Sequence, residues 1–381
     1  MNENIKILTR LCRNNFLFWA SRIIDYPLIA PDIVQVNFSF RCNLACSMCS
    51  MREQMKFLQS QGRRTEIDSD TFRKIIKETQ ELGTKSILFI GGEPLLRSDL
   101  FELIGYARDL GLNTVIVTNA VLLDEEKARK CIEAGVSWLS ISIDAASEGI
   151  FNKIRGKDIL QKIVNNIKTL NRLKEEKGVE FAKIGVVCTI MNDNLEELLD
   201  VAHLTKRLKA EKIIFQPVVT NNADQSCRDP DSSIFIDPSR FHILDGAIDS
   251  LAAYKKSSPE NFNFISNSLG HLKLIKKYLK SPLKSNRWPC YAGYNRLQIA
   301  QDYRIYFCIP PNKTVDASFG DVSGESLKKM WYSQEAKVRR KLIKTCNIPC
   351  LQWCSYRDDF TVLSEIFQKA FLFRLKKVRR K

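Results

Sequence analysis

Histidine is scarce in this chain, with three among 381 residues, and several features that mark particular classes of protein are missing. No apolar run is long enough to span a membrane, and no secretory signal peptide is present. Internal repeats, low-complexity segments and long linkers are missing as well. Together with an apolar content of 44%, these absences favour one large core with a small appended domain.

Three of the twelve cysteines stand in one tight loop with the spacing CxxxCxxC, namely Cys42, Cys46 and Cys49. This loop directly follows the strand-like run 33–40. An iron-sulfur cluster normally has four cysteine ligands, so three in one loop predict a cluster with one iron left without a protein ligand. A structural zinc loop is the alternative, but zinc sites usually combine paired CxxC motifs or contain histidine. The spacing therefore favours a 4Fe-4S cluster with an open iron, where chemistry can take place.

A second motif lies downstream of the cysteine loop, at the end of the apolar run 86–90. It consists of Gly91, Gly92, Glu93 and Pro94. Two glycines let the backbone approach a ligand closely, and a glutamate offers acceptors to an ammonium group. With the cysteine loop 41–49, this motif resembles the radical S-adenosylmethionine (SAM) superfamily, whose GGEP motif binds the methionine amine of SAM. The resemblance covers residues 34–354.

Further matches to the superfamily follow later strand-like runs. They are Thr118 with Asn119, Ser142 with Asp144, and Arg155. The resemblance implies that Ser142 and Asp144 face the ribose of SAM and that Arg155 lies near its carboxylate. Helix caps at Ser142 and Asp144, and a solvated Arg155, are the alternatives. The superfamily usually has an aromatic residue against the adenine where this chain has Met48, and methionine is apolar and adaptable enough to replace it.

Between residues 33 and 217, short apolar runs alternate with amphipathic helical stretches. The predicted strands are 33–40, 86–90, 114–118, 138–143, 181–190 and 212–216. Alternation of this kind predicts a parallel sheet with helices outside it, and the motifs follow strand ends, where barrels place active sites. We therefore expect an α/β fold: a partial (β/α)6 TIM-type barrel with a small C-terminal α+β iron-sulfur domain.

A second cysteine group predicts that C-terminal domain. Its members are Cys290, Cys308, Cys346, Cys350 and Cys354. The first two bracket a predicted hairpin, 296–300 and 304–307, and the group resembles the auxiliary-cluster domain called SPASM in its shorter Twitch form. That resemblance implies an auxiliary 4Fe-4S cluster, with a zinc knuckle as the alternative. Two departures, Tyr303 in place of the usual glycine and the spacing of the last three cysteines, leave the choice of four ligands open.

The predicted organisation has five parts. They are an N-terminal amphipathic extension 1–32, the radical SAM partial barrel 33–218, a helical connector 219–289, the auxiliary-cluster domain 290–356 and a basic amphipathic tail 357–381. Of the remaining cysteines, Cys12, Cys131 and Cys188 are interpreted as small buried residues or surface thiols. Cys227 follows the sixth predicted strand, so a hydrogen-donor role is a hypothesis beside an ordinary loop thiol.

The net charge of +16 is concentrated in the C-terminal third of the chain. Windows 270–288, 326–344 and 360–381 together carry a net charge of +18, so the rest of the chain is about −2 and the predicted barrel is nearly neutral. The last window also carries apolar residues at helical spacing, which predicts contact with an anionic membrane surface or an acidic partner, or simple packing on the protein. Nucleic acid is disfavoured because no recognised RNA- or DNA-binding module is present.

The resemblance implies the chemistry. SAM binds the open iron through the amine and carboxylate of its methionine part. One electron from a reductase such as flavodoxin or ferredoxin then splits the sulfonium of SAM, and the resulting 5′-deoxyadenosyl radical abstracts hydrogen from the substrate. The auxiliary cluster would accept an electron from the substrate or anchor it. Thiolate ligands and free thiols imply a reducing, cytoplasmic compartment, peripheral to the inner membrane surface if the tail contacts lipid.

The substrate is the open part of the prediction. Enzymes of this kind oxidise or epimerise sugars and cyclitols, or modify ribosomal peptides and proteins. Peptide modifiers often carry a leader-binding domain before the barrel, whereas residues 1–32 precede it here. We therefore expect a sugar, cyclitol or lipid-linked polar small molecule, with a peptide or protein as the alternative. A non-catalytic iron-sulfur or zinc scaffold is the third hypothesis, and such a scaffold would make no 5′-deoxyadenosine.

Overall fold

The computed structural model describes residues 3–218, 233–282, 288–308, 317–346, 351 and 356. Four predictions made from the sequence fall outside these residues. They concern Cys227, Cys350, Cys354 and the basic tail 357–381.

All six strands predicted for the barrel are present. They are β1 (Ile33–Asn37), β2 (Ser86–Ile90), β3 (Asn113–Thr118), β4 (Trp138–Ser142), β5 (Lys183–Ile190) and β6 (Lys212–Pro217). The largest shift in a boundary is at β1, which ends at Asn37 because the chain then turns away into the cysteine loop. Even there, the Phe38 N–H still donates to the Ile90 carbonyl at 3.0 Å.

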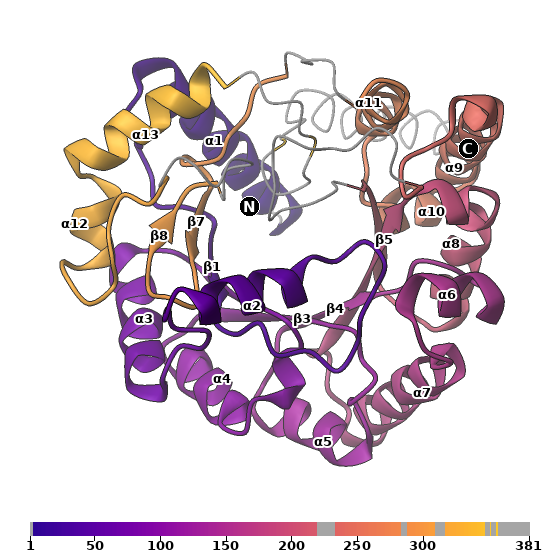
Figure 1. The fold of residues 1–381 in the computed structure, drawn as a ribbon, viewed down its shortest axis with the longest axis horizontal. Coiled ribbons are helices and arrows are strands. Elements are labelled where there is room, and N and C mark those ends of the chain that lie inside the picture. Colours follow the sequence, from indigo (N-terminus) through magenta and orange to yellow (C-terminus); the bar gives the residue numbers. More distant parts are fainter. Residues whose placement is uncertain are drawn as a thin grey trace.

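Helices cover the outside of the sheet, as the alternation of patterns predicts (Figure 1). Those of the barrel are α3 (Ser69–Leu82), α4 (Leu100–Asp109), α5 (Glu125–Glu133), α6 (Glu148–Arg155), α7 (Leu160–Lys177) and α8 (Leu198–Arg207), with short 3-10 turns η1 (Pro94–Leu96) and η2 (Asn192–Glu197). Helix α2 (Met51–Ser60) follows the cysteine loop and is drawn inside this ring of helices. In α3 the side chain of Asp68 caps the first turn, and Gly83 ends the helix in a left-handed conformation at φ 91°. Phe72, Ile75, Ile76 and Leu82 of this helix recur at helical spacing and are buried.

The barrel sheet continues into the C-terminal part of the chain. The predicted hairpin forms β7 (Arg296–Ile299) and β8 (Ile305–Tyr306), and the strand order is β6-β5-β4-β3-β2-β1-β7-β8. Every pair from β6 to β7 is parallel, whereas β7 and β8 are antiparallel. The sheet is therefore open, with β6 and β8 at its two ends, which confirms the predicted partial barrel. The boundary of the auxiliary-cluster domain at residue 290 stays a prediction, but a single sheet contains strands of both the barrel and this domain.

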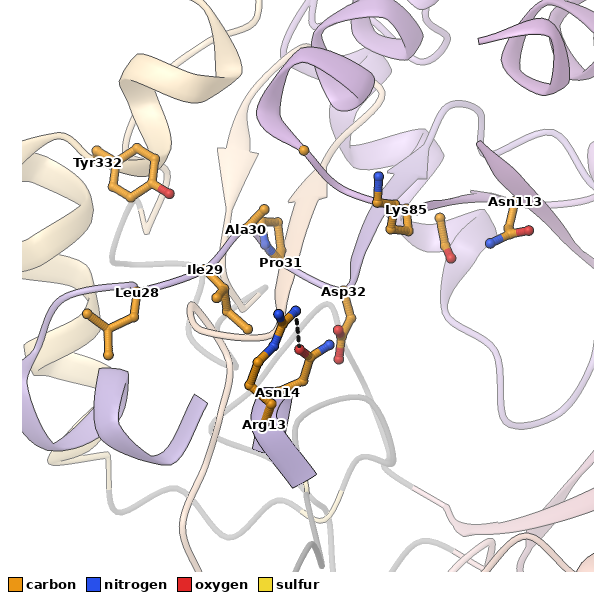
Figure 2. Close-up of a pocket in the computed structure, with 12 residues that line it drawn as sticks. Arg13, Asn14, Leu28, Ile29, Ala30, Pro31, Asp32, Lys85, Asn113 and Tyr332 are labelled. Carbon is orange, nitrogen blue, oxygen red and sulfur yellow. Dashed lines mark hydrogen bonds between the residues drawn. The ribbon is translucent and has the colours of Figure 1, made fainter. Parts of the chain in front are cut away.

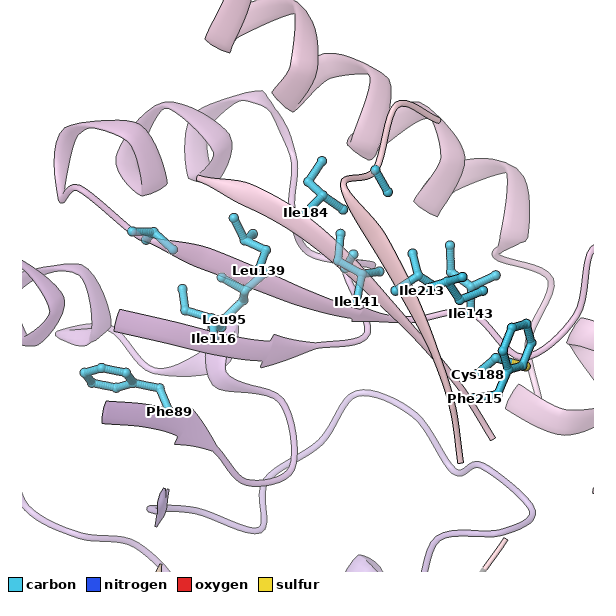
Figure 3. Packing of buried hydrophobic residues seen from close by; sticks show 14 of the residues in the cluster. Phe89, Leu95, Ile116, Leu139, Ile141, Ile143, Ile184, Cys188, Ile213 and Phe215 are labelled. Atoms are coloured by element: carbon cyan, nitrogen blue, oxygen red, sulfur yellow. The ribbon is translucent and has the colours of Figure 1, made fainter. Parts of the chain in front are cut away.

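The core lies between this sheet and the outer helices. Figure 3 shows side chains from β2 to β6, among them Phe89, Ile116, Leu139, Ile184 and Phe215, packing into one layer. Cys131 and Cys188 are fully buried in the same core, whereas Cys12 is half-buried. Burial raises the pKa of Cys131 to about 12, so it behaves as a small apolar side chain, as the sequence predicts.

The remaining elements frame the barrel. The N-terminal extension forms α1 (Glu3–Ile24), and the connector forms η3 (Pro238–Arg240), α9 (Phe241–Ser257), α10 (Pro259–Phe264) and α11 (Leu269–Lys280). After the hairpin come α12 (Leu327–Trp331) and α13 (Gln334–Lys344). Phe18 of α1 is completely buried against Tyr291 and Tyr294, so α1 packs on the segment that leads into β7, and Figure 1 shows α13 near α1.

Candidate active site

The cysteine loop and the GGEP motif contact each other through backbone hydrogen bonds. Past the end of the β1–β2 ladder, Gly92 N–H donates to the Ser39 carbonyl at 2.7 Å and Glu93 N–H donates to the Arg41 carbonyl at 2.8 Å. A Cβ atom on Gly91 would lie 2.3 Å from the Ser39 oxygen, and one on Gly92 would lie 2.1 Å from the Arg41 oxygen. Glycine is therefore needed at both positions because the segment that leads into Cys42 packs against them, whether or not a ligand also approaches.

Glu93 is a buried carboxylate with fixed hydrogen-bond partners. It is 3% exposed and accepts from the Thr118 hydroxyl at 2.6 Å, from Asn119 N–H at 2.8 Å and from Leu95 N–H at 3.0 Å. Burial raises the pKa of Glu93, although these donors favour the charged form. Within the described residues no lysine or arginine forms an ion pair with it, which leaves a buried acceptor suited to a cationic ligand.

The turn after β3 organises the site. Asn119 uses its backbone N–H for Glu93, while its side-chain amide donates to the Asn43 side chain at 2.8 Å and accepts from Val121 N–H at 3.0 Å. Thr118 donates to Glu93 and accepts from Ala120 N–H. These predicted cofactor residues therefore hold Glu93 against the cysteine loop, and their direct contact with SAM stays a prediction.

The cysteine loop is held from the opposite side by the end of α6. Ser47 N–H donates to the Ile154 carbonyl at 2.9 Å, Lys157 donates to the Asn43 carbonyl at 2.9 Å, and Arg155 donates to the Cys46 sulfur at 3.5 Å. Lys157 and Asn43 were not among the residues singled out in the sequence, because a lysine and an asparagine beside motifs carry no pattern of their own. Their role here is to fix the loop.

Arg155 and Asp144 form a buried pair beneath the loop. Arg155 donates to Asp144 Oδ2, and Asp144 Oδ1 accepts from Thr189 N–H at 2.8 Å. Burial alone would lower the pKa of Arg155, but the Asp144 carboxylate and Cys46 outweigh it, and the pKa lies above its ordinary value. The guanidinium therefore stays charged beside a cysteine sulfur, where it stabilises a thiolate. This burial does not fit the solvated alternative for Arg155.

The other predicted site residues differ in their surroundings. Ser142 ends β4 and its hydroxyl makes no hydrogen bond to any described residue, whereas Asp144 is fully buried with both oxygens engaged. Met48 is half-buried against the core. Contact of Ser142, Asp144 and Met48 with SAM stays a prediction.

The three thiols of the loop differ in exposure. Cys42 and Cys46 are half-buried and Cys49 is exposed, and burial raises the pKa of Cys42. In the part of the chain that the structure describes, no three His, Cys, Asp or Glu side chains converge closely enough for a single metal ion. A four-iron cluster is bulkier, because each iron takes its own cysteine.

Comparison with known proteins decides the family. The sequence pattern of the radical SAM superfamily matches residues 36–205, the segment that contains every motif described above. This segment of the chain belongs to the radical SAM superfamily. Members of this superfamily use a 4Fe-4S cluster with SAM, so the two cofactors predicted for the barrel are confirmed at the level of the family.

Relatives of this radical SAM protein have diverse names. It is 30% identical to the Fe-coproporphyrin III synthase of Methanosarcina barkeri over 200 residues, which are 52% of this chain and 47% of that protein. It is also 30% identical to the PqqA peptide cyclase of Bradyrhizobium diazoefficiens over 183 residues, which are 48% of this chain and 45% of that protein. The match thus spans less than half the length of each relative, and it identifies the barrel rather than the substrate.

Two longer matches concern the whole chain. A tungsten-containing aldehyde ferredoxin oxidoreductase cofactor-modifying protein of Pyrococcus furiosus is 23% identical over 344 residues, covering 87% of this chain and 90% of that protein. The structure of Streptococcus suis SuiB bound to precursor peptide SuiA superimposes with a TM-score of 0.63 at 15% identity, covering 89% of this chain and 76% of that chain. The radical SAM fold is therefore shared beyond the barrel.

The auxiliary cysteines of the radical SAM chain are described in part. Cys290 and Cys308 are half-buried at the two sides of the β7–β8 hairpin, and Cys346 is exposed after α13. An isolated antiparallel bridge joins Cys290 to Tyr356, two positions after Cys354 in the sequence. This bridge brings the end of the described chain to Cys290, and cluster binding there stays a prediction.

Tyr303 explains one departure noted in the sequence. It adopts a positive φ of 74° in the hairpin turn, a conformation that favours glycine. Its hydroxyl donates to Asp68 and accepts from Arg64 at 2.5 Å, and the Arg64 guanidinium lies 4.7 Å from the ring centre. These contacts compensate for the strained backbone and tie the hairpin to the start of α3.

Gly92 offers a test of the contact between the two motifs. We expect Gly92→Ala to lower the free energy of unfolding by about 1–3 kcal/mol, because its Cβ would clash with the Arg41 backbone. Gly105→Ala in α4 is the matched control, since a Cβ there meets nothing within 4 Å, and it should stabilise the protein by about 0.5–1 kcal/mol. Thermal unfolding of the iron-free proteins measures both. Equal free energies of unfolding for the two variants would show that segment 39–41 shifts to make room for the added Cβ without loss of stability.

Proposed function

We propose that this chain is an enzyme that binds SAM at the carboxyl ends of its strands and uses it to abstract a hydrogen atom from a substrate. One observation carries the proposal: Glu93, a buried carboxylate that forms no ion pair with a described residue, is joined to the cysteine loop through the hydrogen bonds of Asn119. An ammonium group supplies the charge that such a carboxylate lacks. The methionine amine of SAM is that group.

Each side chain then has a defined part. Cys42, Cys46 and Cys49 hold three irons and leave the fourth for the cofactor, and Arg155 supplies positive charge at Cys46. The cluster and SAM supply radical chemistry when bound, whereas the protein binds, orients and excludes side reactions. Thr118 and Asn119 keep Glu93 in place, and the Ser142 hydroxyl, which has no hydrogen bond to a described residue, is suited to a sugar hydroxyl of the cofactor.

The auxiliary cluster is part of the proposal. Half-buried Cys290 and Cys308, with further ligands from Cys346, Cys350 and Cys354, would hold a second 4Fe-4S cluster beside β7, the strand that pairs with β1. Cys290 precedes β7 and Cys308 follows the antiparallel β8, so this cluster would lie at the amino end of β7. Its role as an electron acceptor for the substrate stays a prediction. The hydrogen-donor role of Cys227 stays a prediction.

A peptide or protein is now the substrate class with more support. Among the relatives described above, one is named for a peptide and one structure holds a precursor peptide, whereas none is named for a sugar. The haem-pathway and cofactor-modifying relatives keep a small molecule open as the second candidate. A reductase such as flavodoxin or ferredoxin would supply the electron in a reducing, cytoplasmic compartment.

The proposed reaction is tested by SAM cleavage. Protein reconstituted with iron and sulfide under anaerobic conditions should release 5′-deoxyadenosine from SAM when dithionite is added, and the amount should rise with time over a protein-free blank. Chromatography of the nucleoside products measures it. A reconstituted protein that holds iron but releases no 5′-deoxyadenosine would support the scaffold hypothesis instead.

A further inference from the structure

The large apolar side chains that reach solvent are gathered on one part of the molecule. Among the described residues there are eleven of them, and nine belong to α1, to the loop that follows it, or to the region of α12 and α13. We call these nine the apolar face: Phe16, Trp19, Ile23, Ile24, Tyr26, Leu28, Tyr332, Val338 and Leu342. Single exposed apolar residues are ordinary, but such a concentration marks an interaction surface.

Contacts between the two ends of the chain join the parts of this face. The rings of Tyr26 and Tyr332 lie 5.8 Å apart. The Lys344 ammonium donates to the Ile23 carbonyl at 3.2 Å and to the Asp25 carboxylate at 3.1 Å, which ties the end of α13 to the end of α1. Figure 1 shows the two helices near each other beside the β7–β8 hairpin.

Helix α1 is apolar on two sides, which a helix that only packs on its own protein does not need. Phe18 and Ser21 face inward and are almost completely buried. Phe16, Trp19 and Ile23, at the spacing i, i+3 and i+7, are 61%, 41% and 53% exposed. The second stripe has no covering element among the described residues.

The charge around the apolar face is basic. On α13, Lys337 and Lys341 are exposed at the spacing i, i+4, next to the exposed pair Val338 and Leu342. Neither lysine forms an ion pair with a described residue. Exposed Arg13 of α1 adds a third cation, while Glu335 is exposed at the start of α13 and Asp25 is neutralised by Lys344.

We propose that the apolar face docks on the surface of a membrane that contains anionic lipids. Aromatic and aliphatic side chains that insert at the headgroup level, beside lysines that attract anionic headgroups, are the composition that such a surface requires. No described helix is long and apolar enough to cross a bilayer, so the contact is peripheral. The lysines would attract an acidic protein partner, but binding such a partner does not require Phe16, Trp19 and Ile23 to be exposed together.

The position of the face sets the orientation of the docked enzyme. Leu28 and Tyr332 line a hollow of about 760 Å³ that is also lined by Arg13 and by residues at the amino ends of β1, β2 and β3 (Figure 2). The cysteine loop and the GGEP motif follow the carboxyl ends of the same strands. Docking through the apolar face therefore turns the proposed SAM site away from the bilayer and leaves it open to a water-borne substrate.

Vesicle binding by the full-length, iron-loaded protein tests the proposal. We expect the protein to sediment with vesicles of phosphatidylglycerol and phosphatidylcholine, and far less with phosphatidylcholine alone. The triple variant Phe16→Ser, Trp19→Ser and Ile23→Ser should bind at least about tenfold more weakly. The matched control is Phe57→Ser with Phe181→Ser, the two exposed apolar residues outside the face, and it should bind like the parent protein.

A second variant tests the same surface without changing any apolar side chain, so that a folding defect in the triple variant cannot decide the result. Lys337→Glu with Lys341→Glu changes only exposed side chains and should also weaken binding at least about tenfold at low salt. Release of the parent protein by added salt would agree with it. Both variants should release 5′-deoxyadenosine from SAM at the parent rate, because the face lies at the opposite end of the strands.

Four results would overturn the proposal. They are failure of the parent protein to bind the anionic vesicles, equal binding to phosphatidylcholine alone, unchanged binding by both face variants, and a parent dimer that the triple variant converts to a monomer. The last result would assign the face to a second copy of the chain. Deletion of 360–381 examines the predicted basic tail separately: if it alone abolishes binding while the face variants bind normally, the contact belongs to the tail.

Discussion

Replacing Cys42, Cys46 and Cys49 together with alanine should abolish release of 5′-deoxyadenosine from SAM and lower the iron content from about eight to about four atoms per chain. The three thiols lie in a partly exposed loop, and Cys42 and Cys46 are only partly buried where they pack against the core. The variant should therefore fold, while the iron that binds the cofactor is lost. Iron analysis and nucleoside chromatography measure the two effects.

Cys12→Ala is the control for this variant. Cys12 is a half-buried cysteine of α1, far in sequence from either cysteine group, so its loss should change neither iron content nor cleavage. Cleavage that persists in the triple variant would contradict the assignment of the loop as the cluster site. Loss of cleavage in the control as well would point to general instability.

Loss of the auxiliary cluster should have a different result. Cys290→Ala with Cys308→Ala should also lower the iron content from about eight to about four atoms, while 5′-deoxyadenosine is still released and the modified product is not formed. The reason is that the barrel retains Glu93 and the whole cysteine loop, whereas the second cluster acts after the radical forms.

The pair of variants separates the two cysteine groups. If both groups hold clusters, only the loop variant loses cleavage and each variant loses about half the iron. Zinc in place of iron in the protein with an intact C-terminal group would contradict the auxiliary cluster and favour the knuckle. Full iron content in the Cys290 and Cys308 variant would contradict the assignment of these two cysteines as cluster ligands.

The barrel strands could be predicted from the sequence because they give short apolar runs between helical stretches, even though β3, β4 and β6 alternate buried and half-buried residues. The helices between them were equally visible: Phe72, Ile75 and Ile76 recur at helical spacing and all are buried in α3. The cysteine loop was predicted from spacing alone, since cluster ligands come from one short segment.

Contacts between distant segments could not be predicted in the same way. The pairing of Ile33 with Arg296 joins residues far apart in the chain, and neither strand carries a pattern that names its partner. Likewise, the sequence shows that Gly92 precedes a glutamate, but the need for glycine arises from the Arg41 oxygen, which the fold brings to it. The burial of Arg155 on Asp144 depends on the same long-range assembly.

The parallel pairing of β7 with β1 has a consequence for how this protein can be divided. Without β7, the first barrel strand would become a free edge, and Val34 and Val36, which are fully buried now, would stand in the outermost strand of the sheet. Unpaired edge strands with apolar side chains recruit other chains and aggregate. The C-terminal hairpin thus protects the barrel against self-association, so the barrel cannot be separated from the hairpin without exposing β1 as an edge.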